Sequence, residues 1–129
     1  MKKQILIVDD ELSILKLLNF VLSPTYDLVI KNSGVDAISW LEEGNNPGLI
    51  ISDLSMPYFD GNLFIRNLKI SGFYRETPVI LVSGEDNLAD LVKDMPFKVN
   101  YFISKPFNPA DLKAAIATIF KEHDAISSI

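Results

Sequence analysis

Short apolar runs recur along the chain, and none of them alternates with polar positions. They lie at residues 5–8, 28–30, 49–51, 79–82 and 101–103. Most are rich in β-branched residues, and apolar runs of this length that end at polar residues are typical of strands buried on both faces. The pattern therefore predicts five strands of a parallel sheet.

The segments between these runs show the spacing of helices. An apolar face begins at Ile14 and continues at Leu17, Leu18 and Val21. The clearest stripe lies near the end of the chain, at Leu112, Ala115, Ile116, Ile119 and Phe120. Asn108 suits the N-cap of that helix and Pro109 its first position. Weaker helices are predicted near residues 34–43, 61–70 and 86–94, and Pro96 is expected to close the last of these.

Strand and helix thus alternate five times, which predicts an α/β fold with parallel strands and helices on both faces of the sheet. The 129 residues suit one domain. We expect that domain at residues 1–122 and a C-terminal tail at residues 123–129. Trp40, on the second predicted helix, is expected to be partly buried.

Composition narrows the function classes. The chain has no cysteine, which excludes disulfides, cysteine-based zinc sites and thiol catalysis. A formal net charge of −5 and the lack of any Lys or Arg run argue against direct binding of nucleic acid. No apolar stretch approaches the roughly 20 residues of a membrane span, and the N-terminal segment is too short for a signal peptide. We therefore expect a cytoplasmic protein that binds no membrane.

Carboxylates follow two of the predicted strands. Asp9 and Asp10 come after the first strand and Asp53 after the third. Ligands of open α/β sheets bind beyond the carboxyl ends of the strands, so these acids would converge if the two strands are neighbours. Close carboxylates raise one another's pKa, and a hard divalent cation removes that cost. Asp9 and Asp10 alone would be interpreted as caps of the first helix; together with Asp53 they predict a Mg²⁺ site.

Two further polar side chains, Ser83 and Lys105, follow the fourth and fifth strands. A lysine at an apolar strand end needs a polar partner, which the acids would supply, although an isolated lysine there is usually solvated. Pro106 keeps the preceding residue extended and makes that peptide bond a candidate for the cis form. Ser83 before glycine is by itself only a turn signal. Phe102 alone reads most simply as a core residue.

Four motifs, in this order and at these separations, resemble the receiver domain of response regulators: ILIVDDE, LIISDLSMPYFDG, VILVSG and YFISKPF. The resemblance extends over about residues 4–121. Each motif alone has little specificity, whereas the four together are highly specific. The resemblance implies a flavodoxin-like, doubly wound sheet of five parallel strands, a (βα)5 unit with the strand order 2-1-3-4-5.

The resemblance also implies a phosphorylation-dependent signalling switch. Asp53 would accept a phosphoryl group from a histidine kinase, a phosphotransfer protein or a small acyl phosphate, with its carboxylate as nucleophile. Asp10 would bind Mg²⁺ directly, Asp9 through water, and Asp53 and the backbone carbonyl of Ser55 would complete the site, so that charge on the phosphoryl group is neutralised. Lys105 would contact a phosphoryl oxygen.

The signal would leave the site through two switch residues. Ser83 would move to hydrogen-bond the phosphoryl group, and Phe102 would turn inward into the space that Ser83 leaves. The surface of the fourth helix, fifth strand and fifth helix would change as the population shifts between two states. Ser55 and Glu85 lie where side chains of the family tune dephosphorylation.

Other positions shape the phosphoacceptor loop or depart from the family pattern. Met56-Pro57 and Gly61 are expected to shape the loop that holds the acceptor carboxylate. Lys98-Val99 stands where the family usually has a small Gly-Ala turn before the fifth strand. Since this loop belongs to the output face, the departure bears on the choice of partner rather than on the chemistry.

The expected partners are a sensor histidine kinase or phosphotransfer protein, and either a separate output partner or a C-terminal output domain missing from this chain. A phosphorylation-dependent homodimer is a further expectation. The start at Met1 favours a stand-alone receiver or the N-terminal piece of a longer regulator over the end of a hybrid kinase.

Alternatives stay open beside this prediction. No enzymatic turnover is expected beyond self-phosphorylation and slow autodephosphorylation, because a small-phosphoester hydrolase would need an acid where Ser55 stands. A flavin or nucleotide domain would show a phosphate loop, and neither GxGxxG nor GxxxxGK[ST] occurs. A receiver-like module that works without phosphorylation is a further alternative. His123 is expected in the last helical turn, in a structural or solvated role.

Overall fold

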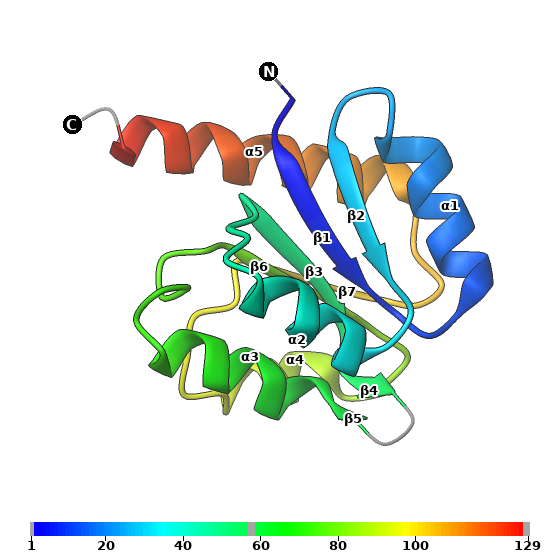
Figure 1. Cartoon of the computed structure of the whole chain (residues 1–129). Coiled ribbons are helices and arrows are strands. Elements are labelled where there is room, and N and C mark those ends of the chain that lie inside the picture. The colour runs from blue at the N-terminus through cyan, green and yellow to red at the C-terminus, as the bar shows by residue number, and fades with distance from the viewer. Residues whose placement is uncertain (1, 57–58, 128–129) are drawn as a thin grey trace.

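The computed structural model describes residues 2–56 and 59–127, which alternate between strands and helices (Figure 1). The strands of the main sheet are β1 (Gln4–Val8), β2 (Asp27–Lys31), β3 (Leu49–Asp53), β6 (Val79–Ser83) and β7 (Tyr101–Ser104). The helices are α1 (Leu12–Leu22), α2 (Gly34–Glu42), α3 (Gly61–Ile70), α4 (Leu88–Lys93) and α5 (Pro109–Ser127). All the predicted strands and helices are therefore present.

The strands of the main sheet are all parallel and lie in the order β2-β1-β3-β6-β7. Because β6 and β7 are the fourth and fifth strands of this sheet, the order is the expected 2-1-3-4-5. β1 lies between β2 and β3, with Ile7 opposite Ile30 on one side and Ile51 on the other. The flavodoxin-like α/β fold is confirmed.

Helices cover both faces of the sheet (Figure 1), and a hydrophobic layer lies between the sheet and the helices on each face. Ile5 and Ile7 of β1 pack with α1 and α5, whereas the alternate residues Leu6 and Val8 pack with α2, α3 and α4. Both side-chain directions of a central strand therefore enter apolar layers, which explains why these strands show no polar alternation. Trp40 is half-buried against the second layer, as expected.

The ends of α5 show one confirmed prediction and one error. Asn108 caps the start, because its Oδ1 accepts a hydrogen bond from the Ala110 N–H at 2.9 Å. The helix then continues to Ser127, so the expected tail at residues 123–129 is helical as far as the structure describes it, and His123 is not in the last turn. An ion pair of 2.7 Å between Lys3 and Asp124 fastens this extension to the start of the chain.

A short antiparallel hairpin that the sequence pattern did not reveal stands between β3 and α3. It pairs β4 (Ser55–Met56) with β5 (Phe59–Asp60), and Met56 is buried. The hairpin follows Asp53 directly and so fixes the loop on which that carboxylate stands. Pro57, which was also expected to shape this loop, lies outside the described residues.

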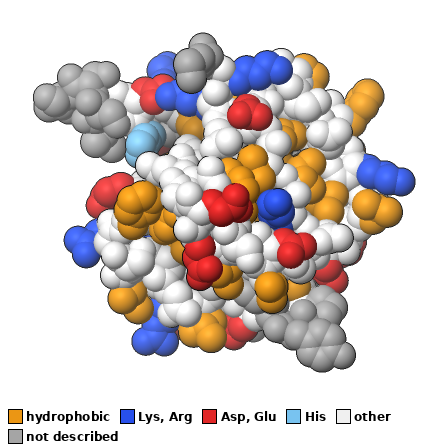
Figure 2. Space-filling model, in the orientation of Figure 1, with side chains coloured by type: hydrophobic (Ala, Val, Ile, Leu, Met, Phe, Trp, Pro, Cys, Tyr) orange, Lys and Arg blue, Asp and Glu red, His pale blue; other side chains and the backbone are white. Residues whose placement is uncertain are grey.

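On the face shown in Figure 2, acidic and basic side chains are interspersed with hydrophobic ones. None of the helices in the described part of the chain combines the length and apolar character needed to cross a membrane.

Candidate functional site

The predicted carboxylates lie together at the carboxyl edge of the sheet. Asp9 and Asp10 follow β1, and Asp53 ends the neighbouring strand β3. One oxygen from each carboxylate lies within 4.8 Å of the others. Asp9 and Asp53 are buried, whereas Asp10 is exposed to solvent. The expected convergence of these three acids is thus present in the structure.

Lys105 extends its ammonium group into this cluster from the end of β7. Its Nζ lies 3.0 Å from Asp9 Oδ2, 3.1 Å from Asp53 Oδ2 and 3.0 Å from Glu11 Oε1. The Lys105–Pro106 peptide bond is cis, the form for which the sequence made it a candidate. Glu11 received no role from the sequence, and the only signal for its contact was its place in the acidic run after β1.

Burial and the contacts with Lys105 have opposing effects on the pKa values of the cluster. Burial raises the pKa of both Asp9 and Asp53. The backbone N–H of Glu11 and the hydrogen bond to Lys105 only partly offset this rise at Asp9, and the charge of Lys105 only partly offsets it at Asp53. Burial by itself would lower the pKa of Lys105, but hydrogen bonds to Glu11 and Asp9 and the charges of Asp9 and Asp53 outweigh it and raise that pKa. The ammonium is therefore charged, and it faces more carboxylates than it can neutralise.

This donor set fits a hard divalent cation. Mg²⁺ prefers carboxylate oxygens and usually keeps several water ligands. Asp9, Asp10 and Asp53 supply the oxygens, and the exposure of Asp10 leaves one side of the cluster open to water. The charge of Asp53 also contributes to the raised pKa of Asp9, a repulsion that a bound cation would remove.

The backbone around Asp53 is tightly packed. The N–H of Ser55 donates to Asp53 Oδ1 at 3.3 Å, and the N–H of Gly61 donates to the carbonyl of Leu54 at 2.9 Å. A Cβ atom on Gly61 would lie 2.3 Å from the carbonyl oxygen of Asp53. Only glycine therefore lets α3 begin this close to the loop, which confirms the role expected for Gly61 and gives its reason.

Ser83 stands at the carboxyl end of β6, beside the strand that ends in Asp53. It is buried, and its Oγ accepts a hydrogen bond from the N–H of Glu85 at 3.1 Å. The hydroxyl of Ser55 donates to Glu85 Oε1 at 3.1 Å. The loops after β3 and β6 are thus linked through Glu85, and Ser83 already uses one oxygen lone pair in that link.

Phe102 lies on β7 and leaves 39% of its surface exposed. It belongs to neither hydrophobic layer among the described residues, so its interpretation as a core residue is wrong. In register it lies beside Leu81, two residues before Ser83. Phe102 is thus an exposed aromatic side chain on the strand next to the one that carries Ser83.

Comparisons with known proteins place this chain among signalling proteins of one family. The family model for the response regulator receiver domain matches residues 5–117. The probable transcriptional regulator ycf27 of Porphyridium aerugineum is 30% identical over 128 residues, which cover 98% of this chain and 52% of that protein. The chain thus spans about half the length of this and similar transcriptional regulators.

Other relatives match along their full length. The chemotaxis protein CheY1 of Helicobacter pylori is 25% identical over 123 residues, covering 94% of this chain and 99% of that protein. Among solved structures, the signal receiver domain of an HD domain-containing protein from Pseudomonas fluorescens Pf-5 has a TM-score of 0.85 and 25% identity. That match covers 97% of this chain and 99% of the other.

Proposed function

Since the chain belongs to the family of response regulator receiver domains, we propose that it is a signalling switch with Asp53 as its phosphoacceptor. The supporting observation is the environment of this one carboxylate. Asp53 is buried at the carboxyl edge, shares a 4.8 Å cluster with Asp9 and Asp10, and has the Lys105 ammonium at 3.1 Å. A nucleophile, metal ligands and a counter-charge for a phosphoryl oxygen therefore meet at one point.

The chemistry follows from these positions. A carboxylate oxygen of Asp53 attacks phosphorus, the bond from phosphorus to the donor nitrogen or oxygen breaks, and the leaving group keeps the electron pair. Lys105 holds an oxygen of the transferred group. The carboxylates of Asp9, Asp10 and Asp53 and the backbone carbonyl of Ser55 would hold Mg²⁺, which supplies positive charge against the phosphoryl oxygens.

The response uses the two switch residues. A phosphoryl group on Asp53 offers a charged acceptor to the Ser83 hydroxyl, which would move toward it from its place beside the Glu85 N–H. The partly exposed Phe102 then turns inward. In this proposal α4, β7 and α5 change their shared surface as the population shifts, so that a partner or an output domain reads the new state.

The proposal extends to partners and turnover. A histidine kinase or phosphotransfer protein donates the phosphoryl group in the cytoplasm, where ATP-using kinases and acyl phosphates occur, and the phosphorylated form pairs with a second copy. Turnover stops at self-phosphorylation and slow autodephosphorylation, because Ser55 rather than an acid stands two residues after Asp53. Repeated turnover of p-nitrophenyl phosphate would contradict this last point and support a hydrolase.

Labelling with acetyl phosphate tests the phosphoacceptor. In Mg²⁺ we expect incorporation to approach one phosphoryl group per chain, by intact-mass measurement, and we expect EDTA to abolish it. Asp53→Asn should lose the label, because the amide is not a nucleophile. The matched control is Asp36→Asn, an exposed carboxylate on α2, which should label like the wild type. Undiminished labelling of Asp53→Asn would assign the acceptor to another residue.

A further inference from the structure

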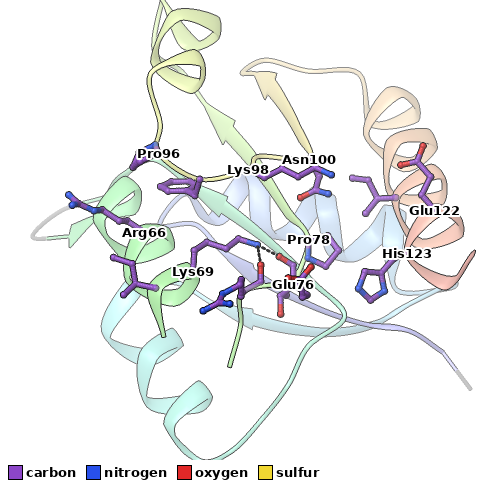
Figure 3. A pocket seen from close by; sticks show the side chains of 14 residues that line it. Arg66, Lys69, Glu76, Pro78, Pro96, Lys98, Asn100, Glu122 and His123 are labelled. Atoms are coloured by element: carbon purple, nitrogen blue, oxygen red, sulfur yellow. Dashed lines mark hydrogen bonds between the residues drawn. The ribbon is translucent and has the colours of Figure 1, made fainter. Parts of the chain in front are cut away.

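A second site candidate lies at the opposite, amino edge of the sheet. It is a cavity of about 710 Å³ between α3, the loops that lead into β6 and β7, and α5 (Figure 3). Pro78 and Asn100, which immediately precede β6 and β7, line it. Because β6 ends at Ser83, a strand of about 15 Å separates this cavity from the carboxylate cluster. Its volume is within the usual range for small-molecule sites.

The cavity concentrates positive charge on an acidic chain. Four cations line it, Arg66, Lys69, Arg75 and Lys98, beside the two carboxylates of Glu76 and Glu122. These side chains give the lining a formal charge of +2, whereas the whole chain carries −5. Four of the twelve lysines and arginines in the sequence therefore meet at one cavity, which favours an anionic ligand.

Lys69 is held in the middle of this cavity. Its ammonium group donates to the backbone carbonyls of Arg75, at 3.1 Å, and of Thr77 (Figure 3). An ammonium group has three protons, so one is left for a ligand. Burial lowers the pKa of Lys69 and the nearby charge of Lys98 lowers it further, against an opposing effect of Glu76. An anion between the two ammonium groups would relieve their repulsion.

The loop before β7 gives the cavity an apolar wall. Its residues 95–99 read MPFKV, the segment in which the sequence departs from the small turn usual in the family. Pro96 and Phe97 from this loop line the cavity together with Pro78 and Ile70. Phe97 is half-buried against the hydrophobic layer, which fixes one part of its ring and leaves the rest accessible. Flat apolar surface next to cations suits a ligand with both a ring and a phosphate.

We propose that this cavity binds a phosphorylated small molecule of nucleotide size. Its phosphates lie between Lys69 and Lys98, and its ring lies against Phe97 and Pro96. Glu122 lines the cavity from α5, on the side opposite α3 in Figure 3, beyond the two lysines. This site is separate from Asp53 and does not depend on phosphorylation.

Isothermal titration calorimetry with ADP tests this proposal. The titration is done on the full chain in EDTA, so that no divalent cation links the phosphates to the carboxyl edge. We expect a dissociation constant below about 1 mM. Pyrophosphate and adenosine should each bind more weakly than ADP, because each uses only the charged or only the apolar part of the cavity. If adenosine or pyrophosphate bound as tightly as ADP, the proposal that both the ring and the phosphates of the ligand contact the cavity would be wrong.

Charge reversal locates the site. Lys98→Glu should weaken ADP binding by about tenfold or more, and Lys98→Gln by a smaller factor, because a charge-assisted contact is lost. Lys16→Glu is the matched control: this lysine is exposed on α1, away from the cavity, and should change affinity by less than about twofold. The absence of ADP binding up to about 1 mM, or equal weakening by Lys98→Glu and Lys16→Glu, would overturn the proposal.

Discussion

The charged side chains at the two edges of the sheet differ in their burial and in their pairing. At the carboxyl edge, Asp9 and Asp53 are buried, and the ammonium of Lys105 lies within 3.1 Å of both. At the amino edge, four cations and two carboxylates line an open cavity, and three of the cations, Arg66, Arg75 and Lys98, are exposed residues. The buried carboxylates of the carboxyl edge thus pair directly with Lys105, whereas the amino-edge cavity keeps a formal charge of +2 and has space for an anionic ligand.

This difference separates stability from recognition. Buried charges make a site rigid and expensive to alter, because removing one member leaves the others unpaired in a low-dielectric interior. Exposed charges of like sign contribute little to folding and are available to a ligand. We therefore expect substitutions at the carboxyl edge to change the free energy of unfolding, and matched substitutions at the amino edge to change binding alone.

Exchange of one lysine at each edge gives the largest expected contrast. Without Mg²⁺, Lys105→Met should lower the free energy of unfolding by about 3 kcal/mol, because Asp9 and Asp53 lose their shared counter-charge. Lys98→Met at the amino edge should change it by less than about 0.5 kcal/mol, since that residue is exposed. Urea denaturation in EDTA measures both values.

Addition of Mg²⁺ then identifies the cause of the Lys105→Met loss. A cation bound among the carboxylates should restore stability to Lys105→Met by more than it adds to the wild type, and by about 2.7 kcal/mol at a hundredfold excess over the dissociation constant. The same addition should leave the small effect of Lys98→Met unchanged. If Lys105→Met and Lys98→Met lowered the free energy of unfolding by equal amounts, the proposed difference between the two edges would be wrong.

The sequence predicted the carboxyl edge well for a physical reason. Parallel strands that are buried on both faces have continuous apolar sequences, so their ends can be recognised in the sequence. Because the strands are parallel, the residues that follow them all lie at the same edge of the sheet. Asp9, Asp53, Ser83 and Lys105 can therefore be grouped from the amino-acid sequence alone. The pairing of Lys105 with Glu11 cannot, because the direction of an exposed side chain depends on loop geometry.

The amino edge was missed because its residues share no local pattern. Arg66 and Lys69 lie on α3, Lys98 in a loop and Glu122 on α5, and only tertiary packing brings them together. The length of α5 was missed for a related reason. Residues after Phe120 lack an apolar stripe, although lysine, glutamate and alanine favour helices, so the amphipathic pattern ended before the helix did.

Packing around Asp53 offers a smaller contrast, between two glycines near the carboxyl edge. Gly61→Ala should cost about 2 kcal/mol, because the new Cβ would meet the backbone of Asp53 and Leu54. Gly84→Ala is the control, since a Cβ there has no atom within 4 Å, and it should change stability by less than about 0.5 kcal/mol. Gly61→Ala should also slow acetyl phosphate labelling, because α3 must shift the loop of Asp53. If Gly61→Ala is as stable and as quickly labelled as the wild type, the loop accommodates the new Cβ atom without cost and the close packing has no energetic role.

The pH dependence of stability is the finest test of the buried carboxylates. Burial raises the pKa of Asp53 in the folded state, so the folded protein binds a proton more readily than the unfolded chain does. In EDTA, the ionised carboxylate of Asp53 therefore disfavours folding at neutral pH, and this cost disappears as the pH falls through the raised folded pKa. Asp53→Asn removes that titration.

The free energy of unfolding of the wild type, measured against that of Asp53→Asn, should consequently rise as the pH is lowered from 7 into the acid range. We expect this pH-dependent change in the free energy of unfolding to be smaller than the effect of Lys105→Met or of Gly61→Ala, because the charge of Lys105 opposes the effect of burial. At the amino edge the pH dependence of stability has the opposite sign. Because burial lowers the pKa of Lys69, its contribution to the free energy of unfolding becomes more favourable as the pH rises toward 10.5. A wild type that loses stability relative to Asp53→Asn on acidification would mean that pairing with Lys105, rather than burial, dominates the environment of Asp53.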